Sequence, residues 1–133
     1  MDESTLHHIN LPAYQVRAMA DFYRETLNLE EVEVAAGARD TVVLSVGGGR
    51  QLHLTRPMPS LLFDTGQFVN PVLRGHIAFQ VPSVEAIMVR LKRLNVRFAD
   101  YGTWALPTTH QVYFHDPEGS VVEAFEVLKG GGL

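Results

Sequence analysis

Four side chains of the sequence could together bind a divalent metal ion: His8, His53, His76 and Glu123. Three imidazoles and one carboxylate suit a borderline divalent ion such as Zn, Ni, Fe, Mn or Co. Each of the four lies in a short stretch in which apolar and other residues alternate, and such alternation predicts a β-strand. The question is whether a fold could bring these four strands together.

The strand faces give a first answer. In three of the stretches the apolar face is plain: Ile9 and Leu11, Leu52 and Leu54, and Ile77 and Phe79. Because successive side chains of a strand point to opposite faces, the histidines should lie opposite the face that packs under helices. The spacing from His8 to His53 nearly equals that from His76 to Glu123, so we expect Glu123 at the position equivalent to His53.

The order of predicted elements repeats along the chain. A strand, a helix and three strands are expected at 5–11, 16–27, 29–35, 41–46 and 51–55, and again at 75–81, 84–94, 96–99, 110–115 and 120–127. An internal repeat of this size decides the fold. We predict an α+β fold, one domain over 1–133, made of a βαβββ module at 5–55, a crossing loop at 56–74 and a second module at 75–127. The modules should form one curved mixed sheet, a cup with the helices outside and the four candidate ligands inside.

The sequence before Glu123 predicts a tight turn. Pro117 sets φ at the first turn position, and Gly119 allows the chain to reverse. After the turn, Glu123 stands between apolar neighbours, where an unpaired carboxylate would be costly to bury. Either a salt bridge or a metal ion could satisfy it.

Further candidates line the same cup. Asn10 shares a strand face with His8 and is predicted to bind substrate. Gln111 and Tyr113 alternate with apolar residues, so Gln111 is predicted to bind substrate and Tyr113 to act in catalysis, although a polar outer face explains them almost as well. Trp104 is a candidate lining residue of a ligand pocket, although core packing is the commoner role of such a residue. His53 is predicted to be the catalytic base if it is not a ligand.

Composition excludes several classes of function. The net charge of −4 and the lack of a basic patch argue against a nucleic-acid partner. No apolar run approaches the roughly 20 residues of a membrane span, and the N-terminus does not have the layout of a secretory signal. The sequence has no cysteine, so a reducing, cytoplasmic location is the expectation.

Together these residues resemble a known family. The resemblance rests on Leu6-His7-His8-Ile9, Phe22 to Leu29, Gly75 to Phe79, and Asp116 to Gly119 followed by Val122-Glu123. These segments look like the vicinal oxygen chelate superfamily, which includes glyoxalase I, fosfomycin-resistance proteins, methylmalonyl-CoA epimerase, bleomycin-resistance proteins and extradiol dioxygenases.

The resemblance implies a glyoxalase-like fold and a divalent metal held by His8, His76 and Glu123. It implies a small-molecule substrate whose vicinal oxygens the metal holds, and either a lyase or isomerase reaction or extradiol-type ring cleavage. Glyoxalase I has a ligating glutamate at the position of His53, so the chain departs from that pattern, and His53 could be a fourth ligand or a base. A homodimer is expected, with the cup built within one chain or across two.

A different class of function has the same fold. A protein of this kind could bind an aromatic or drug-like molecule, as resistance proteins do, without turning it over. Bleomycin-resistance proteins bind without metal and generally lack these ligands. The presence of His8, His76 and Glu123 in register therefore favours the enzyme.

Overall fold

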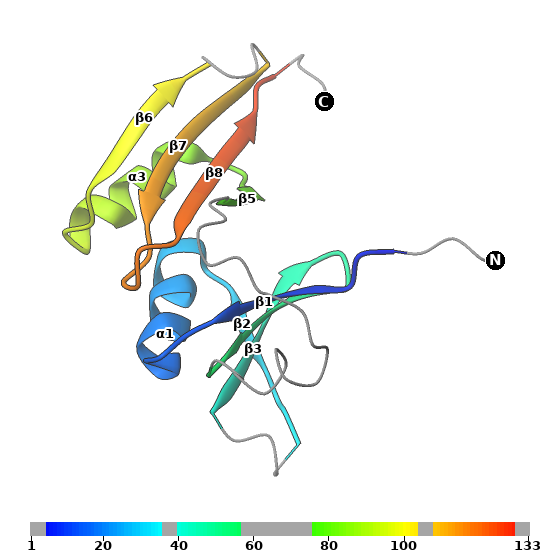
Figure 1. Cartoon of the computed structure of the whole chain (residues 1–133). Coiled ribbons are helices and arrows are strands. Elements are labelled where there is room, and N and C mark those ends of the chain that lie inside the picture. Colours follow the sequence, from blue (N-terminus) through cyan, green and yellow to red (C-terminus); the bar gives the residue numbers. More distant parts are fainter. Residues whose placement is uncertain (1–4, 36–39, 57–75, 104–107, 130–133) are drawn as a thin grey trace, which may run out of the picture. The chain divides into compact units, whose positions relative to one another are not determined.

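The computed structural model describes residues 5–35, 40–56, 76–103 and 108–129, and Figure 1 shows the course of the chain. The order β1 α1 β2 β3 β4 is followed by β5 α3 β6 β7 β8, so the predicted βαβββ repeat is confirmed. Contacts divide the chain into two compact units, residues 1–24 with 28–73 and residues 25–27 with 74–133. Most of the predicted crossing loop 56–74 lies outside the described residues.

The sheet of the first unit has four strands in the order β1-β4-β3-β2. They are β1 (His8–Pro12), β2 (Glu30–Val32), β3 (Thr41–Gly47) and β4 (Arg50–Thr55). β1 pairs with β4 in parallel, and the other pairs are antiparallel. The sheet is therefore mixed, as predicted, and the strand β2 is shorter than the expected 29–35.

The sheet of the second unit repeats this arrangement in the order β5-β8-β7-β6. Its strands are β5 (His76–Gln80), β6 (Phe98–Gly102), β7 (Thr109–His115) and β8 (Val121–Val127). β5 is parallel to β8, and the remaining pairs are antiparallel. The predicted fold class, a mixed-sheet βαβββ module written twice, is thus confirmed.

The strand register shows which residues of the two sheets are equivalent. In the first sheet His53 stands opposite Asn10, two residues after His8. In the second sheet Glu123 stands opposite Ala78, which is likewise two residues after His76. The expected equivalence of His53 and Glu123 therefore follows from the pairing of the strands.

Local signals set the ends of both helices. Helix α1 (Val16–Leu27) ends where Asn28 adopts a left-handed conformation, with φ 57°, which asparagine tolerates better than most residues. Helix α3 (Val84–Arg93) begins after Ser83, whose hydroxyl accepts a hydrogen bond from the Ala86 amide at 3.1 Å. The predicted helices at 16–27 and 84–94 place these two ends correctly. No helix in the described part of the chain is long and apolar enough to cross a membrane.

The core of the second unit lies between α3 and the strands β7 and β8. Helix α3 buries Val84, Ile87 and Leu91. The strands bury Val112, Phe114, Val122 and Ala124. In the first unit Leu52 and Leu54 are buried as expected, whereas Ile9, which was expected on a face packed under helices, is 40% exposed.

Truncating Leu91 tests this core. Leu91 is fully buried, so Leu91→Ala should lower the free energy of unfolding by about 2–5 kcal/mol through lost transfer energy and the cavity left behind. Val89 lies on the same helix but is 57% exposed, so Val89→Ala should change stability by no more than about 0.5 kcal/mol. Urea unfolding of both variants measures the difference, and equal losses would contradict the assigned core.

A strand lies where β6 was predicted, but the predicted bounds were wrong. The sequence favoured a strand at 96–99 and a loop from 100, but β6 runs from Phe98 to Gly102. Its register against β7 shifts between Asp100 and Gly102, which marks a β-bulge. A bulge breaks the alternation of side chains, and for that reason the apolar pattern did not indicate that the strand continues to Gly102.

The turn between β7 and β8 forms as predicted. The Gly119 amide donates to the Asp116 carbonyl oxygen at 3.0 Å, and Gly119 has a left-handed φ of 89°. The buried Asp116 carboxylate also accepts from the amides of Glu118 at 3.0 Å and Ser120 at 2.9 Å. Asp116 therefore fixes the turn that leads into β8, the strand that carries Glu123.

Candidate functional site

In the first unit, His8 and His53 lie against each other. Their rings are stacked, with centroids 3.9 Å apart and planes 5° from parallel. The contact follows from the parallel pairing of β1 and β4, in which His8 and His53 stand two positions apart along the ladder and so share one face. The predicted pairing of these two histidines is therefore present in the structure.

His53 is held by a neighbour on its own strand. Its Nε2 atom lies 2.9 Å from the amide oxygen of Gln51. Desolvation by burial, followed by the nearby rings of His8 and His7, lowers the pKa of His53 below its usual 6.5. The ring is consequently neutral near pH 7, and the neutral form is the one that binds a metal or accepts a proton.

His7 is not among the predicted site residues, because alternation along a strand would point its side chain away from that of His8. The strand β1 begins only at His8, so alternation does not govern His7. Its Nδ1 atom lies 3.0 Å from Nδ1 of His8. The sequence signal for this contact is that His7 and His8 are adjacent and that the strand begins only at His8.

In the second unit, His76 and Glu123 form the corresponding pair. Nε2 of His76 lies 3.0 Å from Oε1 of Glu123, and the side chain of Glu123 is only 12% exposed. The two residues come from the parallel strands β5 and β8, in register-equivalent positions to His8 and His53. The predicted partnership of His76 with Glu123 is present.

Tyr113 lies next to the pair formed by His76 and Glu123 in the second sheet. It stands directly opposite Glu123 in the β7–β8 ladder, and its ring meets that of His76 edge to face with centroids 5.7 Å apart. Desolvation by burial, and then a hydrogen bond to Glu123, raise the pKa of Tyr113 above its usual 10. The phenol therefore stays protonated near neutral pH and can donate a hydrogen bond.

Each pair can be compared with what a metal ion needs. Within the described residues, no group of three or more histidine, cysteine, aspartate or glutamate side chains is close enough together to hold an ion. Zinc bonds to nitrogen and oxygen are about 2.0–2.2 Å long, so two ligand atoms on one ion lie roughly 3 Å apart. The 3.0 Å separation of His76 Nε2 and Glu123 Oε1 fits that requirement. The rings of His8 and His53 lie face to face, so the lone pairs in their ring planes do not converge on one ion, and one imidazole of this pair is available as a ligand.

The remaining predicted site residues differ in their surroundings. Asn10 lies beside His53 in the ladder, and its amide donates to the Thr55 hydroxyl at 3.3 Å. Gln111 is 1% exposed, and its amide donates to the Thr109 carbonyl oxygen at 3.1 Å and to the Thr109 hydroxyl. Trp104 lies outside the described residues.

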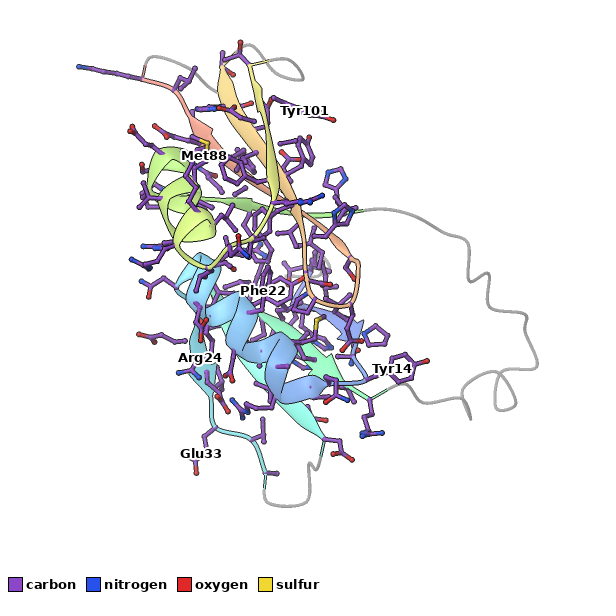
Figure 2. All side chains as sticks on the ribbon, turned by 90° about the vertical axis from the view of Figure 1, so that its left-hand side faces the viewer. Tyr14, Phe22, Arg24, Glu33, Met88 and Tyr101 are labelled. Carbon is purple, nitrogen blue, oxygen red and sulfur yellow. The ribbon has the colours of Figure 1, made fainter. Side chains whose placement is uncertain are left out.

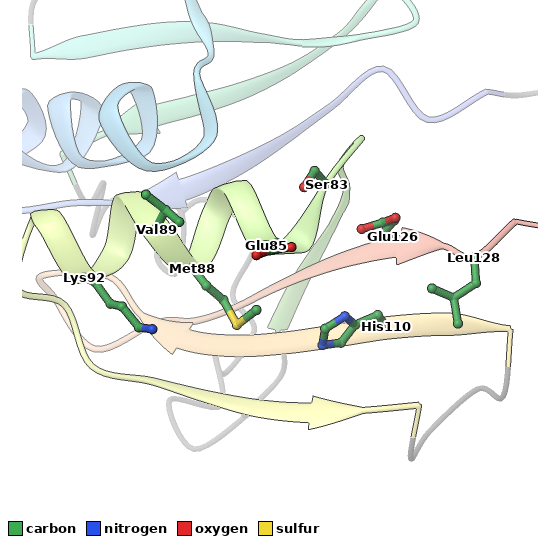
Figure 3. A pocket seen from close by; sticks show the side chains of 8 residues that line it. All are labelled: Ser83, Glu85, Met88, Val89, Lys92, His110, Glu126 and Leu128. Carbon is green, nitrogen blue, oxygen red and sulfur yellow. The ribbon is translucent and has the colours of Figure 1, made fainter.

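A groove of about 390 Å³ opens on the other face of the second sheet. Its lining comes from α3 and from the β7 and β8 region, and includes His110 and Glu126 (Figure 3). Glu126 accepts a hydrogen bond from the Val84 amide at 3.0 Å, at the start of α3, so it lies on the face opposite Glu123. The side chain of His110 is 27% exposed, and its Nε2 lies 2.7 Å from Oδ1 of Asp100.

Comparison with known proteins supports the same fold. A crystal structure of lactoylglutathione lyase from Agrobacterium tumefaciens is 25% identical, with a TM-score of 0.67 over 95% of this chain and 96% of that one. TnmS3, an antibiotic binding protein from Streptomyces sp. CB03234, is 22% identical, with a TM-score of 0.71 over 96% and 98%. A glyoxalase/bleomycin resistance protein/dioxygenase family enzyme from Burkholderia phytofirmans PsJN is 20% identical, with a TM-score of 0.74 over 94% and 100%.

The sequence also matches a protein family over most of its length. No protein of curated function matches the sequence at a significant level. Residues 5–124, which include all of β1 to β7 and Glu123, match the family described as the Glyoxalase/Bleomycin resistance protein/Dioxygenase superfamily. The repeated βαβββ order, the equivalent pairs of residues and this match agree: the chain belongs to the glyoxalase/bleomycin resistance protein/dioxygenase superfamily.

Proposed function

We propose that the protein is a metal-dependent enzyme whose substrate presents vicinal oxygens to a divalent ion held by His8, His76 and Glu123. The observation that carries the proposal is the pair of contacts at register-equivalent positions. His76 Nε2 lies 3.0 Å from Glu123 Oε1, and the His8 and His53 rings stack 3.9 Å apart. A binding protein without a metal has no need of such donors in both sheets.

The bound ion would supply Lewis acidity toward the neighbouring oxygens of the substrate. His53 is proposed as the residue that accepts a proton, because its lowered pKa keeps the ring neutral and Gln51 fixes its orientation. Tyr113, whose protonated phenol hydrogen-bonds Glu123, is proposed to act in catalysis by orienting that carboxylate. Asn10, beside His53 in the ladder, is proposed to orient the substrate.

The reaction is proposed to be either a lyase or isomerase step or an extradiol-type ring cleavage. The similarity to lactoylglutathione lyase supports the first class. The histidine at position 53, where glyoxalase I has a ligating glutamate, weighs against glyoxalase I itself. Both classes need the same arrangement of vicinal substrate oxygens around one ion.

A substrate panel tests the proposal. The protein, reconstituted in separate samples with Fe²⁺, Mn²⁺, Co²⁺, Ni²⁺ and Zn²⁺, should turn over either catechols in the presence of oxygen or hemithioacetals and epimerisable thioesters without it. His76→Ala should abolish the turnover under the same conditions. Turnover that survives in His76→Ala would overturn the assignment of this site.

The second candidate function is sequestration of an aromatic molecule without turnover. It is favoured by one observation, the Tyr101 and Tyr113 rings with centroids 5.0 Å apart beside a hollow of about 460 Å³. The similarity to an antibiotic binding protein supports it as well. Mass spectrometry of a ligand recovered after incubation separates the two functions, because a binder returns the ligand unchanged and an enzyme does not.

We also propose that the protein is a homodimer, as the family resemblance implies. Light scattering at several protein concentrations measures the molar mass directly. A mass equal to that of one 14.8 kDa chain at every concentration would contradict the dimer.

A further inference from the structure

Tyr101 owes its position to the bulge in strand β6. Asp100 pairs with Val112 of β7 and Gly102 pairs with Gln111, so Tyr101 is the extra residue between two consecutive partners. Gly102 has a φ of 58°, a left-handed conformation that favours glycine. Bulges of this kind redirect a side chain and often lie next to active sites.

The bulge is held by one carboxylate. Oδ1 of Asp100 accepts a hydrogen bond from the Gly102 amide at 2.9 Å and lies 2.7 Å from Nε2 of His110 on β7. The Gly102 amide, and then His110, lower the pKa of the Asp100 carboxyl below its usual value. The Asp100 carboxylate thus fixes the backbone on both sides of Tyr101 and links this part of β6 to strand β7.

The ring of Tyr101 continues a row of rings from the candidate metal ligand. His76 meets Tyr113 with centroids 5.7 Å apart, and Tyr113 meets Tyr101 with centroids 5.0 Å apart. Tyr101 is 51% exposed, a high value for a large aromatic residue, and it lies on the edge strand β6 (Figure 2). Tyr101 therefore presents a half-exposed ring at the end of the row of rings that begins at His76.

The hollow beside this row is suited to a flat apolar group. Its volume is about 460 Å³, and its lining includes Phe98, Tyr101, Tyr113, Phe114 and Val121. All of these residues belong to the second unit. Aromatic side chains prefer offset or edge-to-face contacts with other rings, at centroid distances of about 4.5–7 Å.

We propose that Tyr101 is a specificity-determining residue that contacts a planar aromatic group of the substrate, and that Asp100 and His110 are positioning residues that hold Tyr101 in place. The inference rests on the proposed function, because the vicinal oxygens must be bound before the ring beyond them can reach Tyr101. It narrows the substrates already proposed to those in which an aromatic group adjoins the vicinal oxygens.

Two hydroxamates test the inference. Benzohydroxamate and acetohydroxamate bind a metal through the same two oxygens and differ in a phenyl ring against a methyl group. Calorimetric titration of the full-length protein, reconstituted with each of Mn²⁺, Co²⁺, Ni²⁺ and Zn²⁺, gives the ratio of their affinities. In the wild type we expect benzohydroxamate to bind more tightly.

The variants identify the source of that preference. Tyr101→Leu removes the ring and should lower the benzohydroxamate-to-acetohydroxamate ratio by about 3–10-fold, the size of one aromatic contact. Tyr101→Phe keeps the ring and should keep the ratio. Asp100→Ala removes the acceptor of the bulge and should lower the ratio although Tyr101 is present, whereas Asp100→Asn, which keeps a carbonyl oxygen for Gly102, should preserve most of it.

The outcomes separate this inference from the proposed function. An unchanged ratio in Tyr101→Leu, with both hydroxamates bound, overturns the role of Tyr101 and leaves the metal site in place. An unchanged ratio in a folded Asp100→Ala overturns the positioning role alone. Failure of the wild type to bind either hydroxamate with any ion overturns the proposed metal site, and the inference that rests on it is then wrong as well.

Discussion

Replacing Glu123 by glutamine should lower the affinity of the protein for a divalent ion by about 100-fold or more. Loss of a residue that only supports a ligand costs roughly 10–100-fold, and Glu123 is proposed to be a ligand itself. An amide oxygen carries no charge to offset the ion. The side chain keeps its size in Glu123→Gln, so the contacts with His76 and Tyr113 can persist and the fold is preserved.

Strand β8 offers a matched control for this prediction. Glu126 lies on the same strand but on the opposite face. There its carboxylate oxygen accepts a hydrogen bond from the backbone amide of Val84, at the start of α3. Glu126→Gln makes the same chemical change and keeps that acceptor. Metal titration of both variants should therefore show a large loss for Glu123→Gln and none for Glu126→Gln, and equal affinities would remove Glu123 from the ligand set.

Replacing His53 by glutamine should lower kcat by about 10²–10⁴-fold, the usual contribution of a positioned general base. Glutamine has no group that takes up a proton near neutral pH. The stack of His53 on His8 and its contact with Gln51 are the geometry that this variant disturbs. If His53 acts as a base, the variant keeps its metal; if His53 is a fourth ligand, metal affinity falls together with kcat.

The pH profile gives an independent check on the same residue. Desolvation by burial, and then His8 and His7, lower the pKa of His53 below 6.5. A base works in its unprotonated form, so kcat/KM should rise with pH through a value below 6.5 and then level off. The rise should disappear in His53→Gln, and an unchanged acidic limb in that variant would assign the proton to another group.

Much of the fold could be predicted because local signals and periodicity agree. Asn28 and Ser83 end and begin helices through conformations and hydrogen bonds that their side chains favour. Pro117 and Gly119 specify the turn before β8. The pairs His8 with His53 and His76 with Glu123 followed from strand alternation combined with the internal repeat, because two residues with equivalent positions in two modules have equivalent neighbours.

The parts that could not be predicted are those where alternation fails. The bulge at Tyr101 hid the true extent of β6, and its cause, the Asp100 carboxylate bonded to Gly102, involves a side chain rather than a pattern. His7 precedes the start of β1, so parity gave the wrong direction for its ring. The buried contact of Gln111 with Thr109 lies within one strand and leaves no signal in the spacing of apolar residues.

The metal content of the purified protein, prepared without an affinity tag that binds metal, tests the central claim most directly. Elemental analysis should find close to one divalent ion per site in the wild type and far less in His76→Ala and Glu123→Gln. Iron or manganese would direct the assay first to catechols with oxygen, and nickel, cobalt or zinc to hemithioacetals and epimerisable thioesters. A wild-type protein that holds no metal, even after reconstitution with each of these ions, would contradict the enzyme and favour the ligand-binding protein.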